Sequence, residues 1–493
     1  MRPLNIYLLT RVIDLDEFLN LHKQLSNLKF KINQEDHEFK TLKAFVNLIK
    51  AIGLNIEDFE GFFYSYKIPQ IGKEFDLLKF NNDKCLNIEL KSCMTSEEKI
   101  RDQLVKNHYY LKALHKQIYS FTFVYSENLC FRLDEENNLI GCDIEEIISS
   151  IKYFNEEFIS DINSLFKISN YLVSPINTPK SFIEHSYFLT SQQDDIKSRI
   201  MKKVNNSNTH NFISIKGSPG TGKTLLVYDI ARELSTIKNI LLIHCGIKSE
   251  GQKQIEDYYS NIHIIVPKEV NDDFKFEKYD IIIIDEVQRI YISQFESICN
   301  AVKDQNKICI FSSDKHQILS QSEQRRAIWD KIDSLENIEQ YQLSEKIRTN
   351  SEMASFIRKV RNININEIFD SHNIEVIYAN NYEEAKDILD YYKNRKYTFI
   401  NFSRSNYNYS PYSKYEYDYD THHVIGQEFD NVVMILDKSF YYNEKNILCA
   451  VSHPNPNYLY TQLLYQGITR VRERLTLIIL DNKDLYDKII SIL

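Results

Sequence analysis

The chain has 493 residues, of which 43% are hydrophobic and 26% charged, so it reads as an ordinary globular protein long enough for two to four domains. Its formal net charge of −9 excludes attraction of nucleic acid by overall charge, and any such contact must use local basic patches. The eight cysteines form no CxxC pair and no apolar run reaches transmembrane length, so we expect no zinc site, no disulfide framework, no signal peptide and no membrane span, and a reducing, cytoplasmic location.

A β-hairpin is predicted near the middle of residues 1–170. The segment Gly72–Leu78 leads through the turn Asn81-Asn82-Asp83 into Leu86–Lys91. Asp76 lies on the first strand, while Glu89 and Lys91 are two apart on the second and share one face. Two carboxylates and a lysine would therefore converge across the hairpin. Carboxylates suit Mg²⁺, which can activate water and steady a leaving oxygen.

The pattern Asp76…Glu89-x-Lys91 resembles the core of PD-(D/E)XK nucleases. The resemblance implies a restriction-endonuclease-like α/β domain over residues 1–170, with Asp76 and Glu89 as metal ligands and Lys91 as a catalytic group. A helix is expected from about Glu97 to His115, and the resemblance makes Gln103 on it a further catalytic candidate. It also implies a glutamate on the first helix, which is Glu38 or its competitor Glu35. A surface hairpin with ordinary charges is the alternative.

The rest of the chain is predicted to form a linker and two sheet domains. Residues 171–188, with Pro175 and Pro179, indicate a linker. Strand–helix alternation with buried β-branched strands follows, which is typical of two tandem RecA-like, doubly wound parallel sheets over 189–345 and 346–493. The expected strands are Ile213–Ile215, Ile240–His244, Ile264–Val266, Ile281–Ile284 and Ile308–Phe311, and then Glu375–Tyr378, Tyr397–Asn401, Asn431–Leu436 and Leu475–Leu480. The tyrosine-rich stretch 406–420 is predicted to be a surface loop or insertion.

A phosphate-binding loop is the most specific motif. Residues Gly217–Thr224 match G-x-x-x-x-G-K-[ST] between a predicted strand and a predicted helix. Gly217, Gly220 and Gly222 allow backbone N–H groups to surround phosphate oxygens. Lys223 would reach the phosphates, and the Thr224 hydroxyl would hold Mg²⁺. ATP and Mg²⁺ are therefore the predicted cofactors.

An acidic pair follows the apolar run Ile281–Ile284. At the end of a central parallel strand, Asp285 would bind Mg²⁺ and Glu286 would polarise the attacking water. A strand that merely ends in two solvated acidic residues is the alternative.

Further short segments fall in an order that resembles superfamily 1 helicases over residues 189–480. The compact first domain resembles the helicase-like domain of Schlafen-related proteins. The resemblance implies that Gln193 reads adenine, that Gln317 senses the γ-phosphate and that Arg348 and Arg470 contact the phosphates. The segments are Leu189–Gln193, Asp285–Gln288, Ser313–Gln317, Leu343–Arg348, Gly426–Asp430 and Thr469–Arg472.

We call Gly426–Asp430 the coupling segment, because the same resemblance implies that it links nucleotide to nucleic acid. The chain departs from the family pattern near this segment and before it. Ser313 replaces a glycine, Ile425 replaces a glutamine, and Asp420 replaces a threonine, although His422 is retained.

Together the motifs predict an ATP-dependent nucleic-acid motor coupled to a Mg²⁺-dependent nuclease, with DNA favoured over RNA. Similar fusions occur in bacterial defence against phage, and DNA repair or recombination is the other setting. A nucleotide-switched sensor or scaffold without nuclease activity is the alternative function. An ATPase of the chaperone class fits less well, because the second half of the chain has the pattern of another sheet domain. A partner subunit or a homo-oligomer stays open.

Overall fold

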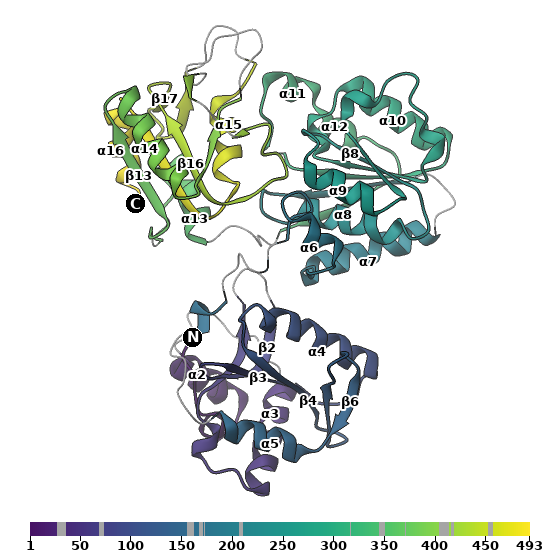
Figure 1. Cartoon of the computed structure of the whole chain (residues 1–493), viewed down its shortest axis with the longest axis vertical. Coiled ribbons are helices and arrows are strands. Elements are labelled where there is room, and N and C mark those ends of the chain that lie inside the picture. The colour runs from purple at the N-terminus through teal and green to yellow at the C-terminus, as the bar shows by residue number, and fades with distance from the viewer. Residues whose placement is uncertain are drawn as a thin grey trace. The chain divides into compact units, whose positions relative to one another are not determined.

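The computed structural model describes two compact units, Met1–Tyr171 and Leu172–Leu493 (Figure 1). The described residues are 1–26, 36–68, 73–154, 162–166, 171, 173–206, 211–315, 317–344, 351–369, 371–403, 414–415, 419–451 and 457–493. Among them, no helix is long and apolar enough to cross a membrane.

The first unit contains a six-stranded mixed sheet in the order β1-β2-β3-β4-β5-β6. β2 and β3 form the predicted antiparallel hairpin, with Leu77 opposite Ile88, and β3 pairs with β4 in parallel. The predictions of this hairpin and of the helix after it are confirmed. The strands are β1 (Phe62–Lys67), β2 (Glu74–Phe80), β3 (Lys84–Lys91), β4 (Gln117–Val124), β5 (Leu129–Leu133) and β6 (Leu139–Cys142); the helices are α1 (Ile6–Leu9), α2 (Leu15–Ser26), α3 (Asp36–Ile52), α4 (Glu97–Lys112) and α5 (Ile144–Tyr153).

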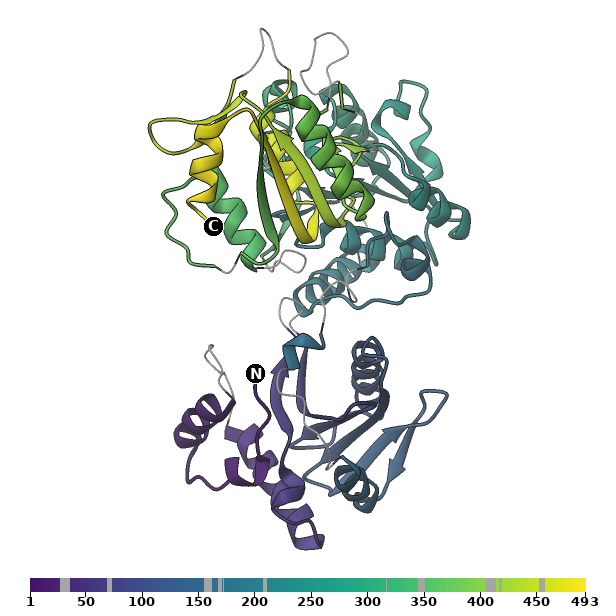
Figure 2. The same ribbon diagram turned by 60° about the vertical axis from the view of Figure 1, so that its left-hand side comes forward.

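Helices cover both faces of this sheet (Figure 2). The apolar residues of α3 recur at helical spacing and pack with Leu86 and Ile88 of β3 in one core. α4 begins at the N-cap Ser96, whose hydroxyl accepts the Lys99 N–H, and it packs through Ile100 and Leu104 in a second, smaller core. The alternation along β3 leaves Asn87, Glu89 and Lys91 on the face that α4 covers.

The second unit contains two parallel sheets, in the orders β12-β7-β11-β10-β8-β9 and β13-β19-β16-β14-β15, and a small hairpin β17–β18. The prediction of two parallel sheets is confirmed. In the first sheet the strands are β7 (Asn211–Gly217), β8 (Ile240–His244), β9 (Ile262–Ile265), β10 (Ile281–Asp285), β11 (Ile308–Ser313) and β12 (Ile338–Leu343); the others are β13 (Ile374–Ala379), β14 (Thr398–Asn401), β15 (Tyr419–Asp420), β16 (Phe429–Leu436), β17 (Phe440–Tyr442), β18 (Leu448–Ala450) and β19 (Val471–Leu480).

Helices flank both sheets of this unit (Figure 1). The central strands of the first sheet are buried on both faces, which is why they read as continuous apolar runs. The helices are α6 (Pro179–Ile183), α7 (Ser191–Asn206), α8 (Lys223–Leu234), α9 (Glu250–Tyr258), α10 (Ile292–Asp304), α11 (Gln321–Arg326), α12 (Ile328–Asp333), α13 (Ser351–Arg361), α14 (Tyr382–Asn394), α15 (Tyr460–Ile468) and α16 (Lys483–Ile490); short 3₁₀ turns lie at Glu57–Phe59, Ile162–Ser164, Pro267–Glu269, Phe276–Lys278 and Val287–Arg289.

Backbone hydrogen bonds join the two sheet domains within this unit. Leu459 N–H donates to Leu319 O at 2.9 Å, and Gln321 N–H donates to Asn457 O at 2.8 Å. The segment before α6 contributes as well, because the Glu428 N–H donates to Asn177 Oδ1 at 3.0 Å. Residues of the coupling segment are therefore held close to the first sheet domain.

Gly251 at the start of α9 is predicted to tolerate no side chain. A Cβ built there would lie 2.1 Å from the Ile176 carbonyl oxygen. We expect Gly251→Ala to lower the free energy of unfolding by about 1–3 kcal/mol, although alanine is the better helix former. Chemical denaturation measures this change. Gly141→Ala is the matched control, because a Cβ there meets nothing within 4 Å. Equal stability of the two variants would contradict the close contact.

Candidate functional site

The phosphate-binding loop connects the end of β7 to the first residue of α8. Gly220 and Gly222 have φ angles of +79° and +78°, which favour glycine. A Cβ on Gly217 would lie 2.6 Å from Thr221 Oγ1. The backbone thus passes closely around the helix N-terminus, where N–H groups and the helix dipole favour an anion.

Two side chains, those of Lys223 and Gln193, donate hydrogen bonds to backbone carbonyl groups of the phosphate-binding loop. Lys223 Nζ donates to the carbonyl oxygens of Gly217 and Ser218, at 2.9 and 3.2 Å, and lies 3.8 Å from Asp314 Oδ2. Gln193, only 1% exposed, donates to the carbonyl oxygens of Thr221 and Gly222. The predicted adenine reader therefore supports the loop itself through its amide nitrogen.

Asp285 ends β10 and is fully buried beside this loop. Its Oδ2 lies 3.3 Å from Thr224 Oγ1 and its Oδ1 accepts a hydrogen bond from Ser312. Burial alone would raise the pKa of Asp285, but the neighbouring His244, Ser312 and Lys223 hold that pKa below its ordinary value. The carboxylate is thus kept ionised next to a hydroxyl, and both groups suit the oxygen-seeking Mg²⁺. Thr224 and Asp285 are the residues that would hold the ion.

Glu286 follows in a left-handed backbone conformation, with φ of +61°. Such conformations at non-glycine residues store strain and concentrate at functional sites. Its carboxylate accepts a hydrogen bond from Gln288 at 2.6 Å and lies 3.7 Å from the buried Arg289 guanidinium. Gln317 is 2% exposed and its backbone N–H bonds to Asp314 O. The predicted water-polarising and γ-phosphate-sensing residues both lie buried at the carboxyl edge of this sheet.

Arg470 comes from the second sheet domain, after α15. It is 6% exposed, and its guanidinium donates to the carbonyl oxygens of Gln466 and Gln427 at 3.3 and 3.4 Å. Its own carbonyl accepts the Phe429 N–H at 2.9 Å. Arg470, which is predicted to contact the phosphates, is therefore bonded directly to the coupling segment.

The departures from the helicase pattern have local structural roles. Asp420 Oδ1 accepts the N–H groups of His422 and His423 at 2.8 and 3.0 Å, so it caps the turn that leads to the coupling segment. Ile425 is 3% exposed and belongs to the core of the second sheet domain. The family's polar residue is thus replaced by an apolar one that packs.

Some predicted residues lie outside the described part of the chain. They are Glu35, Arg348 and most of the stretch 406–420.

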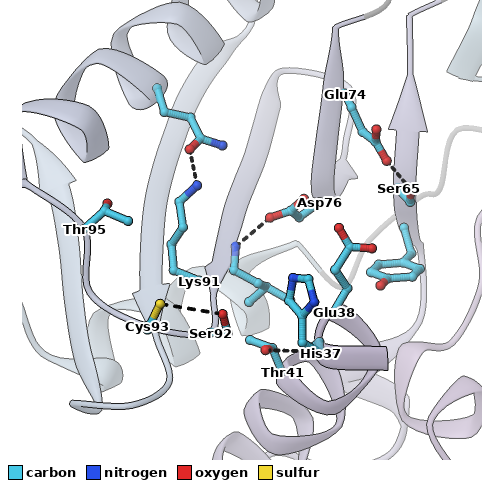
Figure 3. Close-up of a pocket in the computed structure, with 13 residues that line it drawn as sticks. His37, Glu38, Thr41, Ser65, Glu74, Asp76, Lys91, Ser92, Cys93 and Thr95 are labelled. Atoms are coloured by element: carbon cyan, nitrogen blue, oxygen red, sulfur yellow. Dashed lines mark hydrogen bonds between the residues drawn. The ribbon is translucent and has the colours of Figure 1, made fainter. Parts of the chain in front are cut away.

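A polar pocket of about 260 Å³ in the first unit brings together most of the predicted nuclease residues (Figure 3). Glu38 comes from α3, Asp76 from β2, Lys91 from the end of β3 and Gln103 from α4. The other lining residues are His37, Thr41, Tyr64, Ser65, Glu74, Leu90, Ser92, Cys93 and Thr95.

Glu89 lies beside this pocket and is held by two amides. Gln103 Nε2 donates to Glu89 Oε2, and Asn107 Nδ2 donates to Oε1 at 2.6 Å. Gln103 Oε1 also accepts from Lys91 Nζ, so one glutamine joins the lysine to the carboxylate. Asn107 was not predicted as a site residue, although its i, i+4 spacing from Gln103 on α4 could have indicated it.

The charge of Glu89 acts on the buried carboxyl group of Asp76. Burial, and then the negative charge of Glu89, raise the pKa of Asp76 well above its ordinary value. The Leu90 N–H donates to Asp76 Oδ2 at 2.7 Å. A divalent cation would neutralise such a pair of carboxylates.

Asp76 lines this pocket and Glu89 lies beside it, so two carboxylates are available as oxygen ligands. Within the described ranges, no group of three or more His, Cys, Asp or Glu residues is placed to hold a metal ion. Mg²⁺ is commonly bound through one or two carboxylates and keeps several waters. Asp76 and Glu89 are the two that would hold it.

One family model matches the part of the chain that contains the loop. An AAA domain model matches residues 201–323, a range that includes Lys223, Asp285 and Gln317. The match supports a P-loop ATPase in this part of the chain. A comparison with curated proteins gives no match.

Solved helicase structures share low sequence identity with the chain. The arterivirus nonstructural protein 10 helicase is 13% identical, with 57% of this chain and 61% of that chain covered and a TM-score of 0.32, so the chain spans less than two thirds of it. The Pif1 helicase from Candida albicans is 13% identical, with 62% and 98% covered and a TM-score of 0.34. The Bacteroides sp Pif1 in complex with ADP-AlF4 is 13% identical, with 62% and 96% covered and a TM-score of 0.30.

Proposed function

We propose that the chain is an ATP-driven nucleic-acid motor of the superfamily 1 type that also carries a Mg²⁺-dependent nuclease. The observation that carries the motor is the bonding of Arg470 to the coupling segment. Its guanidinium bonds to Gln427 O and its carbonyl to Phe429 N–H. Groups from both sheet domains would surround ATP, so closure on the nucleotide would be a domain motion that moves a bound strand.

On this proposal the residues divide the work of phosphoryl transfer. Lys223 neutralises phosphate charge, Glu286 orients the attacking water and Arg470 stabilises the charge that develops. Thr224 and Asp285 would hold Mg²⁺, which would supply positive charge against the phosphates. Gln193 keeps the loop closed through Thr221 and Gly222 until nucleotide arrives.

The nuclease proposal depends on the pocket that Asp76, Lys91 and Gln103 line. Mg²⁺ bound there would polarise the scissile phosphate and lower the pKa of water. Glu89 is oriented by Gln103 and Asn107, and Lys91 is held beside it by the same glutamine. These contacts would align the lysine with the attacking water, which suits hydrolysis of a phosphodiester bond in DNA.

The proposed biological setting is defence against phage, by analogy with other nuclease–helicase fusions. A host strain that carries the gene would then resist infection, and the Lys223→Ala and Lys91→Ala variants would each lose that resistance. Sensitivity to DNA damage in a deletion strain, with no effect on infection, would favour repair instead.

The motor is tested by ATP turnover with and without nucleic acid. We expect phosphate release to rise several-fold with single-stranded DNA, because the coupling segment would pass the effect of DNA binding on to Arg470. Double-stranded DNA and RNA of the same sequence are the comparison substrates. ATP binding without any stimulated turnover would contradict the motor and favour a nucleotide-switched sensor or scaffold.

A further inference from the structure

His244 is a buried titratable residue that the proposed motor does not use. It ends β8, is 1% exposed and pairs in parallel register with Asp285 of β10. Its Nδ1 lies 3.4 Å from Asp285 Oδ2. Thr224 Oγ1 lies 3.3 Å from the same oxygen. The imidazole thus borders the carboxylate oxygen that, with Thr224, would face Mg²⁺.

Another edge of the same ring lies near the backbone of the coupling segment. A Cβ built on Gly426 would lie 2.5 Å from Ile176 Cδ1 and 3.3 Å from His244 Cε1, and one built on Gly246 would lie 2.6 Å from His244 Nε2. Gly426 has a φ of +75°, so a glycine is favoured where its backbone passes the ring. A Cβ on Gly246 would also lie 3.2 Å from Ile425 Cγ2. The ring therefore stands between the metal-binding carboxylate and the backbone of the second sheet domain.

We infer that His244 is a positioning residue through which the coupling segment adjusts Asp285. This inference rests on the proposed motor function. Ser312 holds Oδ1 of the carboxylate, so Oδ2 is the oxygen that a shift of the ring displaces. The imidazole ring is rigid and its burial restricts rotation about χ1 and χ2, so a movement of Gly426 would be passed to Nδ1. Residues that orient a metal ligand set its affinity for the ion.

Two substitutions separate the two contacts of the ring. In His244→Asn an amide nitrogen replaces Nδ1, but the part of the ring that meets Gly426 is removed. In His244→Phe a ring still fills the space beside Gly426, but both nitrogens are removed. If His244 only filled space, the two substitutions would not affect different properties of the protein.

The measurements are nucleotide affinity with Mg²⁺ and with EDTA, from a fluorescent ATP analogue, and the ratio of DNA-stimulated to basal ATP turnover. We expect His244→Phe to lose about tenfold or more of the affinity gain that Mg²⁺ gives, with the ratio retained. We expect His244→Asn to keep that gain but to show a stimulation ratio that falls from several-fold in wild type to about one. His263→Asn and His263→Phe are the matched controls, because His263 is an exposed histidine at the edge of the same sheet.

The outcomes distinguish this inference from the proposed function. If both His244 variants lower the Mg²⁺ gain and the ratio together, or change neither, the positioning role is wrong. Unfolding temperatures of all variants identify a general loss of folding. If wild type shows no stimulation by any nucleic acid, the motor proposal fails, and the affinity measurement alone decides whether His244 positions Asp285. Loss of the Mg²⁺ gain in His244→Phe but not in His244→Asn would then support it.

Discussion

Lys223→Ala is expected to reduce ATP turnover by about 10²- to 10³-fold, the loss that follows removal of one preorganised group that stabilises transition-state charge. Lys223 Nζ already lies at the loop, where it bonds to the carbonyl oxygens of Gly217 and Ser218. Lys223 is the cationic residue of the loop sequence Gly217–Thr224, so its ammonium would lie close to a phosphate bound there. Steady-state phosphate release in the presence of single-stranded DNA measures the effect.

Lys216→Ala is the matched control for this prediction. Lys216 lies next to the loop on β7, but its ammonium pairs with Asp333 at 2.6 Å and also bonds to Gln340. Turnover should therefore stay within about threefold of wild type, since an ion pair of this kind contributes little. If Lys223→Ala keeps more than about a tenth of wild-type turnover, the loss is too small for a group that stabilises phosphate charge. The role assigned to Lys223 would then be wrong.

Lys91→Ala is expected to reduce Mg²⁺-dependent cleavage by about 10²- to 10³-fold, while ATP turnover continues. The lysine lines the pocket of the first unit and donates to Gln103, which in turn bonds to Glu89. Its removal takes a cation from beside the paired carboxylates and frees the glutamine that holds one of them. Cleavage of end-labelled DNA at saturating Mg²⁺ measures the rate.

Lys84→Ala on the same strand provides the comparison. Its ammonium lies 3.7 Å from the centre of the Tyr153 ring, at the other end of β3. We expect cleavage by this variant to match wild type. If the two lysine variants cleave at equal rates, the pocket is not a nuclease site, and the first unit is then better explained as a binding module.

The strands of both parallel sheets could be predicted because burial on two faces leaves an uninterrupted apolar run. Ile281–Ile284 is such a run and lies in the middle of its sheet. β12 could not be recognised in this way. It is an edge strand with the alternating sequence Ile338–Leu343, and its exposed side carries polar residues. β1 was missed as well, although Phe62, Phe63 and Tyr64 at its start are buried.

Residues that are set by a motif could be predicted, and residues that are set by strand register could not. Lys223, Thr224 and Asp285 follow from local patterns that carry their own chemistry. His244 has no motif and is brought to Asp285 only because β8 lies beside β10 with these two residues in register. Ser312 reaches the same carboxylate from β11, the neighbour on the other side. Such contacts depend on the order of the strands in the sheet, and this order could not be predicted from the single sequence.

The hairpin of the first unit shows the same division. The spacing of Glu89 and Lys91 places them on one face, and the structure has both beside α4. The support of Glu89 by Asn107 depends on how α4 packs, through Ile100 and Leu104, and this packing follows from tertiary contacts. Glu38 lines the pocket, whereas its competitor Glu35 lies outside the described residues.

Cleavage of labelled single- and double-stranded DNA and RNA with Mg²⁺, with and without ATP, tests the central claim most directly. Wild type is compared with Lys91→Ala and Lys223→Ala. We expect wild type to cleave DNA, Lys91→Ala to abolish cleavage, and Lys223→Ala to remove the effect of ATP on the cleavage rate. Wild type that turns over ATP but cleaves none of these substrates would contradict a motor-coupled nuclease.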